Sequence, residues 1–202
     1  MTPPIVAPAG ASQFAGSRRI PAPVNEPVKN YAPNSAERTE LQARLASMSS
    51  EGAEIPVVIG GKRIFTGNTG AQVMPHAHRH VIADWHKAGT EEVHAAIAAA
   101  TAAQREWAAW SWEDRCGVFL KAAELLTTTR RATLNAATML GQSKTVHQAE
   151  IDAACELIDF WRFNAAFAQE IYAEQPISTN STWNQSDYRP LEGFVYAVSP
   201  FN

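Results

Sequence analysis

Apolar side chains recur at helical spacing near the start of the chain's patterned region. Leu41, Leu45 and Met48 lie three or four residues apart, between Ser35 and Gly52. Ser is favoured at the N-cap of a helix and Gly just past its C-terminal end. The spacing therefore predicts a peripheral amphipathic helix between Ser35 and Gly52.

Four further helices are predicted between Thr90 and about Glu174. Thr90 is the expected cap of the first, and Ser111 begins the second with a sequence close to a capping box. The last carries a broad apolar surface, which is typical of a well-covered helix. The predicted helices start or end near Thr90, Trp110, Ser111, Leu126, Arg130, Gln142, Val146 and Ala173.

Extended structure is predicted on both sides of this helical region. Ile55–Ile59 and Lys62–Thr66 flank Gly60-Gly61, and such a Gly pair supplies the positive φ values of a tight hairpin turn. Two more extended stretches follow, over residues 72–76 and 81–87.

The C-terminal residues 194–198 are apolar at every position, which favours a strand buried between two layers. Residues 182–188 are expected to pair with it, so that 182–198 forms an extended hairpin. A helical middle between two β regions favours an α/β or α+β fold.

The Ser199-Pro200 pair ends the predicted strand and places Phe201 and Asn202 at its carboxyl end, where ligands bind in open α/β sheets. A carboxamide there can donate a hydrogen bond to a developing oxyanion. Because termini are usually exposed, we interpret Asn202 as a truncation point.

Composition excludes several classes of partner. The 202 residues are 46% hydrophobic and 18% charged, with a formal charge of −3, so no electrostatic footprint for nucleic acid is present. No apolar run is long enough for a membrane span. Two cysteines make neither a disulfide framework nor a zinc site, which favours a reducing compartment.

Residues 1–34 are rich in Pro and Ala and are predicted to be a disordered arm. Arg18 and Arg19 leave organelle targeting as an alternative. Residues 35–202 then form the structured part.

Several residues carry candidate chemistry. His76, His78 and His80 alternate and would share one face of a strand, but no nearby Cys or carboxylate completes a metal site, so a solvated edge is favoured over metal binding. Cys116 lies on an apolar stripe and is interpreted as a core residue. Glu156 is expected on the same side of its helix as Asp152 and Phe160, at the border of the apolar surface. A carboxylate there is either solvated or binds an amine, and spacing alone favours the first.

Motifs along most of the chain, from Asn25 to Asn202, resemble one enzyme family. They include Asn25-Glu-Pro-Val, Gln148-Ala-Glu-Ile-Asp and Ser199-Pro-Phe-Asn202, and their order and spacing agree with those of the family. They are similar to the 1-pyrroline-5-carboxylate dehydrogenases, within the aldehyde dehydrogenases. The resemblance implies the N-terminal part of an aldehyde dehydrogenase fold of the α/β class.

The resemblance also implies a function. Members of that family oxidise L-glutamate 5-semialdehyde, a small-molecule substrate, to L-glutamate with NAD in proline catabolism. By position, Asn202 corresponds to the oxyanion-stabilising Asn, Ser199 and Phe201 border the NAD site, and Glu156 lines the substrate pocket. A homo-oligomer is expected for the full-length enzyme, located in the bacterial cytoplasm or in the mitochondrial matrix of a eukaryote.

The family's nucleophilic cysteine and general-base glutamate are expected beyond Asn202, so the 202 residues alone are predicted to be inactive. The alternative is a helical interaction module that binds a partner through its tryptophans, without catalysis.

Overall fold

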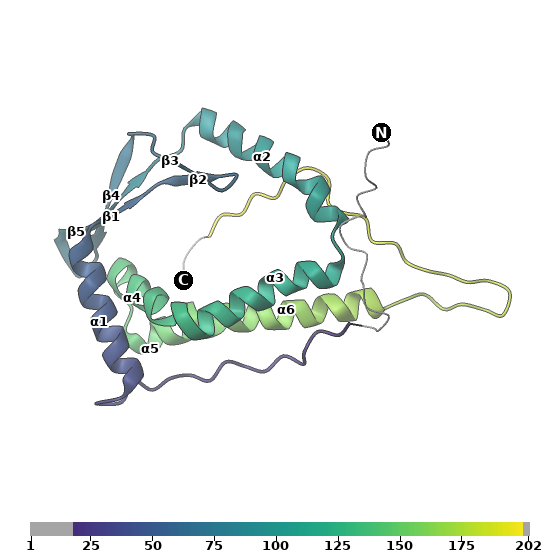
Figure 1. Ribbon diagram of the computed structural model, residues 1–202, viewed down its shortest axis with the longest axis horizontal. Helices are drawn as coiled ribbons and strands as arrows, with labels where there is room; N and C mark the ends of the chain where they lie inside the picture. The colour runs from purple at the N-terminus through teal and green to yellow at the C-terminus, as the bar shows by residue number, and fades with distance from the viewer. Residues whose placement is uncertain (1–17, 200–202) are drawn as a thin grey trace, which may run out of the picture.

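The structure, a computed structural model, describes residues 18–199. Helices make up most of it, and two small sheets lie at one end (Figure 1). The elements follow in the order α1 Ala36–Glu51, β1 Ala53–Ile55, β2 Val57–Ile59, β3 Lys62–Ile64, β4 Thr69–Met74, β5 Ala77–His86, α2 Thr90–Ala109, α3 Trp112–Leu125, η1 Leu126–Arg130, α4 Arg131–Gln142, α5 Val146–Gln148, η2 Ala149–Cys155 and α6 Glu156–Ala173. The segments η1 and η2 are π-helical.

The capping residues in the sequence correctly predict the starts of two helices and miss a third by one residue. The Ser35 side chain accepts from Arg38 N at the start of α1, and the Ser111 side chain accepts from Asp114 N at the start of α3, as predicted. At α2 the expected cap is wrong by one residue. Gly89 is the N-cap, because its backbone N–H donates to the Glu92 carboxylate at 2.7 Å and Thr90 is already helical.

The strands form two separate sheets. The three-stranded sheet has the order β1-β5-β4, with β1 parallel and β4 antiparallel to β5. The hairpin of β2 and β3 is confirmed, and Gly60 and Gly61 take φ values of 54° and 75° in its turn. Such values favour glycine, because a Cβ would clash with the backbone.

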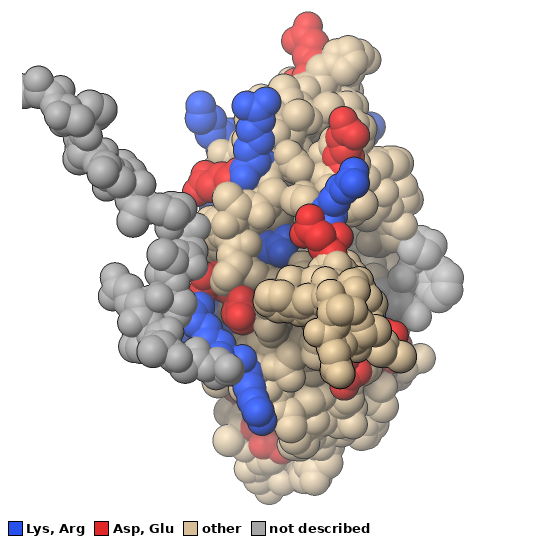
Figure 2. Space-filling model, turned by 90° about the vertical axis from the view of Figure 1, so that its right-hand side faces the viewer, with Lys and Arg blue, Asp and Glu red and all other residues tan. Residues whose placement is uncertain are grey.

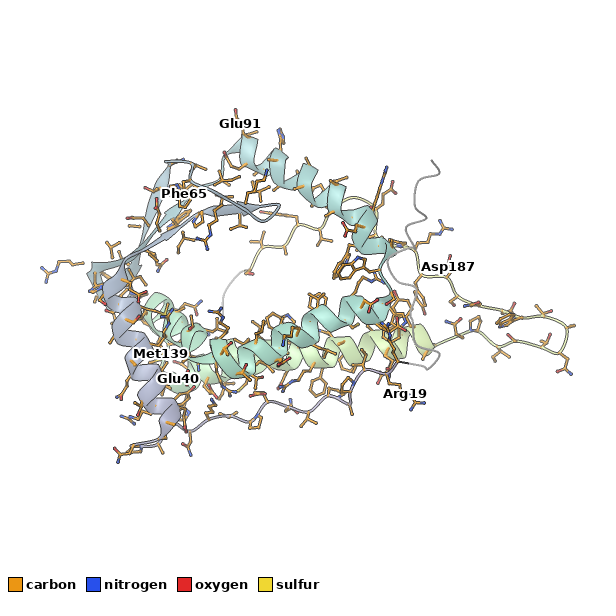
Figure 3. All side chains as sticks on the ribbon, in the orientation of Figure 1. Arg19, Glu40, Phe65, Glu91, Met139 and Asp187 are labelled. Atoms are coloured by element: carbon orange, nitrogen blue, oxygen red, sulfur yellow. The ribbon has the colours of Figure 1, made fainter. Side chains whose placement is uncertain are left out.

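Two apolar clusters hold the helices together. The first joins α1 to α4 around Leu41 and Ala136, and Figure 3 shows Met139 where these helices meet. The second joins α3, η1 and α6 around Ala123, Leu126 and Ile158. The long helix pair α3 and α6 lies side by side because of this second cluster (Figure 1).

The predicted disorder of the arm is wrong for residues 18–34, which we call the strap, whereas residues 1–17 lie outside the described part. The strap runs in extended form beside the α3 and α6 pair to the start of α1 (Figure 1). Helix side chains accept its backbone N–H groups: Ile20 N donates to Gln169 and Lys29 N to Glu150, each at 2.7 Å. Composition predicted disorder because the strap has few groups of its own to bury, but the helices supply its partners.

A cluster of buried charges fastens the strap. Arg131 is 2% exposed and donates to carboxylate oxygens of both Glu26 and Glu150. Glu150, at 0% exposure, also accepts from Tyr31 Oη at 2.7 Å and from Asn135 Nδ2 at 2.8 Å. Two of these residues come from the strap and the others from α4 and η2, so the cluster joins three segments. Its members are Glu26, Tyr31, Arg131, Asn135 and Glu150.

The charges of this cluster balance. Arg162 of α6 adds a second cation, with Nη1 2.8 Å from Glu26 Oε2, so two guanidinium groups face two carboxylates. Burial alone would raise the pKa of Glu150, but the hydrogen bonds from Arg131 and its neighbours outweigh it and lower that pKa to about 2. Paired and hydrogen-bonded charges are the form in which ionised groups are tolerated inside proteins.

The C-terminal strand prediction is not met. Residues 194–198 have no ladder partner among the described residues, and the only bridge near them joins Thr179 to Thr182. Phe194, Val195, Tyr196 and Val198 are 50 to 82% exposed rather than buried. A run that is apolar on both faces becomes buried only between two layers, and the described residues offer it no sheet.

Replacing Arg131 by Met should lower the free energy of unfolding by about 3 to 5 kcal/mol, because two buried carboxylates lose their partner. Urea unfolding of the purified chain measures this. Lys121→Met is the matched control, since Lys121 pairs with Glu124 at 2.9 Å on the exposed surface and should cost at most about 1 kcal/mol. Equal small losses for both variants would contradict the role of the cluster.

Stability should also fall in acid through Glu150. Its pKa is lowered from the ordinary 4.5 to about 2, so its contribution is complete above about pH 4.5 and is lost as the pH falls toward 2. The difference corresponds to roughly 3 kcal/mol. Unfolding free energies at several pH values should show a flatter slope over this range in Glu150→Gln than in the original chain, and parallel slopes would refute the assignment.

Candidate functional site

The residue assigned to substrate binding, Glu156, lines a pocket at the first turn of α6. The pocket has a volume of about 360 Å³ and lies between α6 and the strap. Positions 156, 160, 163 and 167 recur at helical spacing, so one face of α6 supplies most of its wall. Its lining residues are Asn25, Glu156, Asp159, Phe160, Phe163, Asn164 and Phe167.

The expected neighbours of Glu156 are half right. Phe160 shares the pocket, but Asp152 does not line it and instead pairs with Lys144 at 2.8 Å. Asp152 lies within the π-helical segment η2, which ends directly before Glu156, and the wider turn of a π-helix changes which residues share a face. Regular helical spacing therefore fails across this boundary.

The apolar surface predicted for the last helix, residues 146–173, is only partly buried. Ala154, Cys155 and Ile158 are buried, whereas Phe160 and Phe167 are exposed along the pocket. The expectation of a well-covered helix is thus not met along the pocket face by the described residues. Three phenyl rings beside a carboxylate suit a ligand with both an aliphatic part and a cationic group.

Glu156 is exposed and makes no hydrogen bond or ion pair with residues 18–199. No Lys or Arg lines the pocket. The second carboxylate, Asp159, is already engaged, since it accepts from Asn25 Nδ2 and from Glu26 N at 2.7 Å each. Glu156 is therefore the carboxylate that remains available to a cation in this pocket.

Neither cysteine is suited to act as a nucleophile. Both are buried, and burial raises the pKa of the Cys116 thiol. Burial, with Glu150 nearby, raises the pKa of Cys155 to about 11. Thiolates are the reactive form, so both side chains are inert core groups, as predicted for Cys116.

Two of the three alternating histidines, His76 and His80, contact different elements. His76 precedes β5 and has its Nδ1 2.7 Å from Ser143 Oγ, whereas His80 Nε2 lies 2.7 Å from the carbonyl oxygen of Ser49. Within residues 18–199 no group of three or more His, Cys, Asp or Glu side chains is arranged to hold a metal ion.

The remaining predicted site residues lie at the C-terminal end. Ser199 is exposed, and its hydroxyl makes no hydrogen bond with the described residues, so its contact with NAD stays a prediction. Phe201 and Asn202 lie outside the described part. Glu26, Arg131 and Asn135 were missed by the sequence reasoning, because no local pattern marks a polar side chain that is buried through partners about a hundred residues away.

The sequence profile of the aldehyde dehydrogenase family matches residues 64–202, more than half of the chain. The chain belongs to the aldehyde dehydrogenase family. The resemblance noted in the sequence is thereby confirmed.

Within the aldehyde dehydrogenase family, named relatives share nearly half of their aligned residues with the chain. A delta-1-pyrroline-5-carboxylate dehydrogenase of Agaricus bisporus is 48% identical over 91% of this chain and 34% of its own length. The mitochondrial enzyme of that name from Bos taurus is 49% identical over 88% of this chain and 32% of its own. The chain therefore spans about a third of the length of these relatives.

Solved structures of the family confirm the fold. The delta-pyrroline-5-carboxylate dehydrogenase of Mycobacterium tuberculosis bound with NAD is 49% identical and superimposes with a TM-score of 0.91, over 94% of this chain and 36% of that one. A 1-pyrroline-5-carboxylate dehydrogenase from Thermus with bound NAD gives a TM-score of 0.70 at 28% identity, over 84% of this chain and 32% of that one. The α/β fold class, as the N-terminal part of an aldehyde dehydrogenase, is confirmed.

The tryptophans of the alternative interaction module mostly contact other rings of the chain. The ring centroids of Trp107 and Trp110 lie 5.4 Å apart, and Trp112 stacks on Tyr172 with the same distance between centroids.

Acidic and basic side chains are interspersed on the face drawn in Figure 2. No helix in residues 18–199 combines the length and the apolar character that crossing a bilayer requires. The comparisons do not favour the interaction module.

Proposed function

We propose that this chain supplies the N-terminal third of an NAD-dependent dehydrogenase that oxidises L-glutamate 5-semialdehyde, formed from 1-pyrroline-5-carboxylate, to L-glutamate in proline catabolism. The similarity to dehydrogenases of that name over nearly the whole chain carries the proposal. The pocket at Glu156 supports it independently, because its chemistry suits an amino acid aldehyde.

The substrate has an α-ammonium and an α-carboxylate at one end and the reacting aldehyde at the other. Glu156 attracts the ammonium, and the rings of Phe160, Phe163 and Phe167 contact the aliphatic chain. Donors for the substrate carboxylate are not among the residues that line this pocket, so another part of the enzyme provides them.

The reacting end is assigned to the C-terminal residues. Asn202 donates its side-chain N–H to the aldehyde oxygen as negative charge develops there. Ser199 and Phe201 would border the NAD site, and bound NAD would supply the acceptor for the hydride that leaves the substrate carbon. The attacking thiolate comes from another part of the enzyme, since Cys116 and Cys155 are buried with raised pKa values.

Two further properties belong to the proposal. The exposed apolar residues 194–198 become covered by the rest of the dehydrogenase, which assembles as a homo-oligomer. Its compartment follows its source, the cytoplasm in a bacterium or the mitochondrial matrix in a eukaryote, and relatives from Bos taurus and Dictyostelium discoideum are named as mitochondrial.

Glu156→Gln in the complete dehydrogenase should lower kcat/KM for the amino acid semialdehyde by about ten- to a hundredfold, mainly through KM, because a charge-assisted hydrogen bond is lost. Formation of NADH measures the rate. A plain aliphatic aldehyde of equal length should be unaffected.

Glu170→Gln is the matched control, because Glu170 is exposed on the same helix outside the pocket. Equal losses on both aldehydes would make Glu156 a structural residue. If the unmodified enzyme reduces no NAD with the semialdehyde, the proposed function is wrong.

Asn202→Ala in the complete dehydrogenase should lower kcat by about 10² to 10³, the usual effect of removing one oxyanion donor. Steady-state rates with saturating aldehyde test this, after circular dichroism has shown an unchanged fold. A decrease of less than threefold would exclude the oxyanion role.

A further inference from the structure

The strap contributes Asn25 to the wall of the Glu156 pocket, and at this point it is bound by the carboxylate of Asp159. Asp159 Oδ2 accepts from Asn25 Nδ2 and its Oδ1 accepts from Glu26 N, each at 2.7 Å. The side chain of Glu26 continues into the buried charge cluster, where Arg131 and Arg162 donate to it. Asn25, the next residue along the strap, is therefore fixed beside the pocket from two directions.

The bond to Asp159 determines how the Asn25 amide is oriented. A carboxylate only accepts hydrogen bonds, so the amide nitrogen must face Asp159 and the amide oxygen is left as an acceptor. This oxygen makes no hydrogen bond with residues 18–199. Asn25 thus presents an unused acceptor on a side chain that lines the pocket.

The pocket consequently offers two unused acceptors of different kinds. One is the Glu156 carboxylate, and the other is Asn25 Oδ1, while Asp159 has its oxygens occupied by strap donors. An ammonium group has three N–H donors and no acceptor. A single carboxylate leaves part of this donor capacity unmet, and a neutral amide oxygen meets it without adding charge.

We propose that Asn25 determines specificity in this pocket, by accepting a hydrogen bond from the α-ammonium of the amino acid semialdehyde beside Glu156. Asp159 is a positioning residue that acts through Asn25, because both of its oxygens already accept from strap donors. The inference rests on the proposed function and adds the strap to the substrate site. It requires that the strap be docked for the amino acid aldehyde to be distinguished from a plain one.

The first test is Asn25→Ala in the complete dehydrogenase. We expect KM for the amino acid semialdehyde to rise about tenfold, with kcat and the KM for a plain aliphatic aldehyde of equal length within twofold of the original. The variant should fold, because the Asn25 side chain is exposed and the bond from Glu26 N to Asp159 remains. Asn30→Ala is the matched control on the same strap, since Asn30 does not line this pocket, and it should change neither KM.

The second test is a double-mutant cycle with Asp159→Asn. A carboxamide has one acceptor oxygen for two donors, so Asn25 loses its fixed orientation. The KM for the amino acid semialdehyde, divided by the KM for the plain aldehyde, should rise in Asp159→Asn. Adding Asp159→Asn to Asn25→Ala should raise this ratio no further. Additive effects on the ratio would show that Asp159 does not act through Asn25 and would overturn its positioning role.

The outcomes separate the two proposals. If the unmodified enzyme prefers the amino acid semialdehyde and Asn25→Ala leaves the KM ratio unchanged, the inference about Asn25 is wrong and the proposed function stands. If the unmodified enzyme does not reduce NAD with the semialdehyde, the proposed function itself fails. Should Asp159→Asn not fold, Asn25→Ala with its Asn30→Ala control decides the role of Asn25.

Discussion

The guanidinium of Arg131 is buried between the carboxylates of Glu26 and Glu150. It joins the strap to α4 and to the π-helical segment η2 in one place. Buried ion pairs are weak sources of net stability, because desolvation offsets most of the attraction, but an unmatched buried charge is very unfavourable. The strap is therefore restricted to the one position in which every charge has a partner.

This restriction extends from the interior to the surface pocket. Glu26 is the residue that enters the cluster, and its neighbour Asn25 is the residue that lines the pocket. A shift of the strap by one residue would remove the carboxylate from Arg131 and the amide from Asp159 together. The interior thus sets the register of a pocket wall that has no regular secondary structure of its own.

The sequence predicts features whose causes are local. Ser35, Ser111 and the pair Gly60-Gly61 mark helix starts and a turn through their own backbone preferences, and the structure agrees. Glu156 could be placed near an apolar border, but its relation to Asp152 could not, because Asp152 lies in a π-helical segment and the spacing argument assumes a regular α-helix.

Features that depend on distant partners escaped the same reasoning. The strap has the composition of a disordered arm, and its order comes from carboxylates of η2 and α6. The apolar residues 194–198 suggest a buried strand, yet burial depends on neighbouring layers and not on the run itself. The pattern of apolar and polar residues shows which side chains favour burial, and the tertiary structure determines whether they are buried.

The sequence distance between the strap and its partners has a consequence for how the protein is made. Glu26 and Arg131 are 105 residues apart, and Ile20 and Gln169 are 149 apart. At a synthesis rate of about 5 to 20 residues per second, the strap leaves the ribosome roughly 5 to 30 seconds before the helices that hold it. During that interval Glu26 and Tyr31 remain in water, and only the later arrival of Arg131 and Glu150 gives them partners. The strap is synthesised before the helices that hold it, so this wall of the pocket cannot form until α6 has been made.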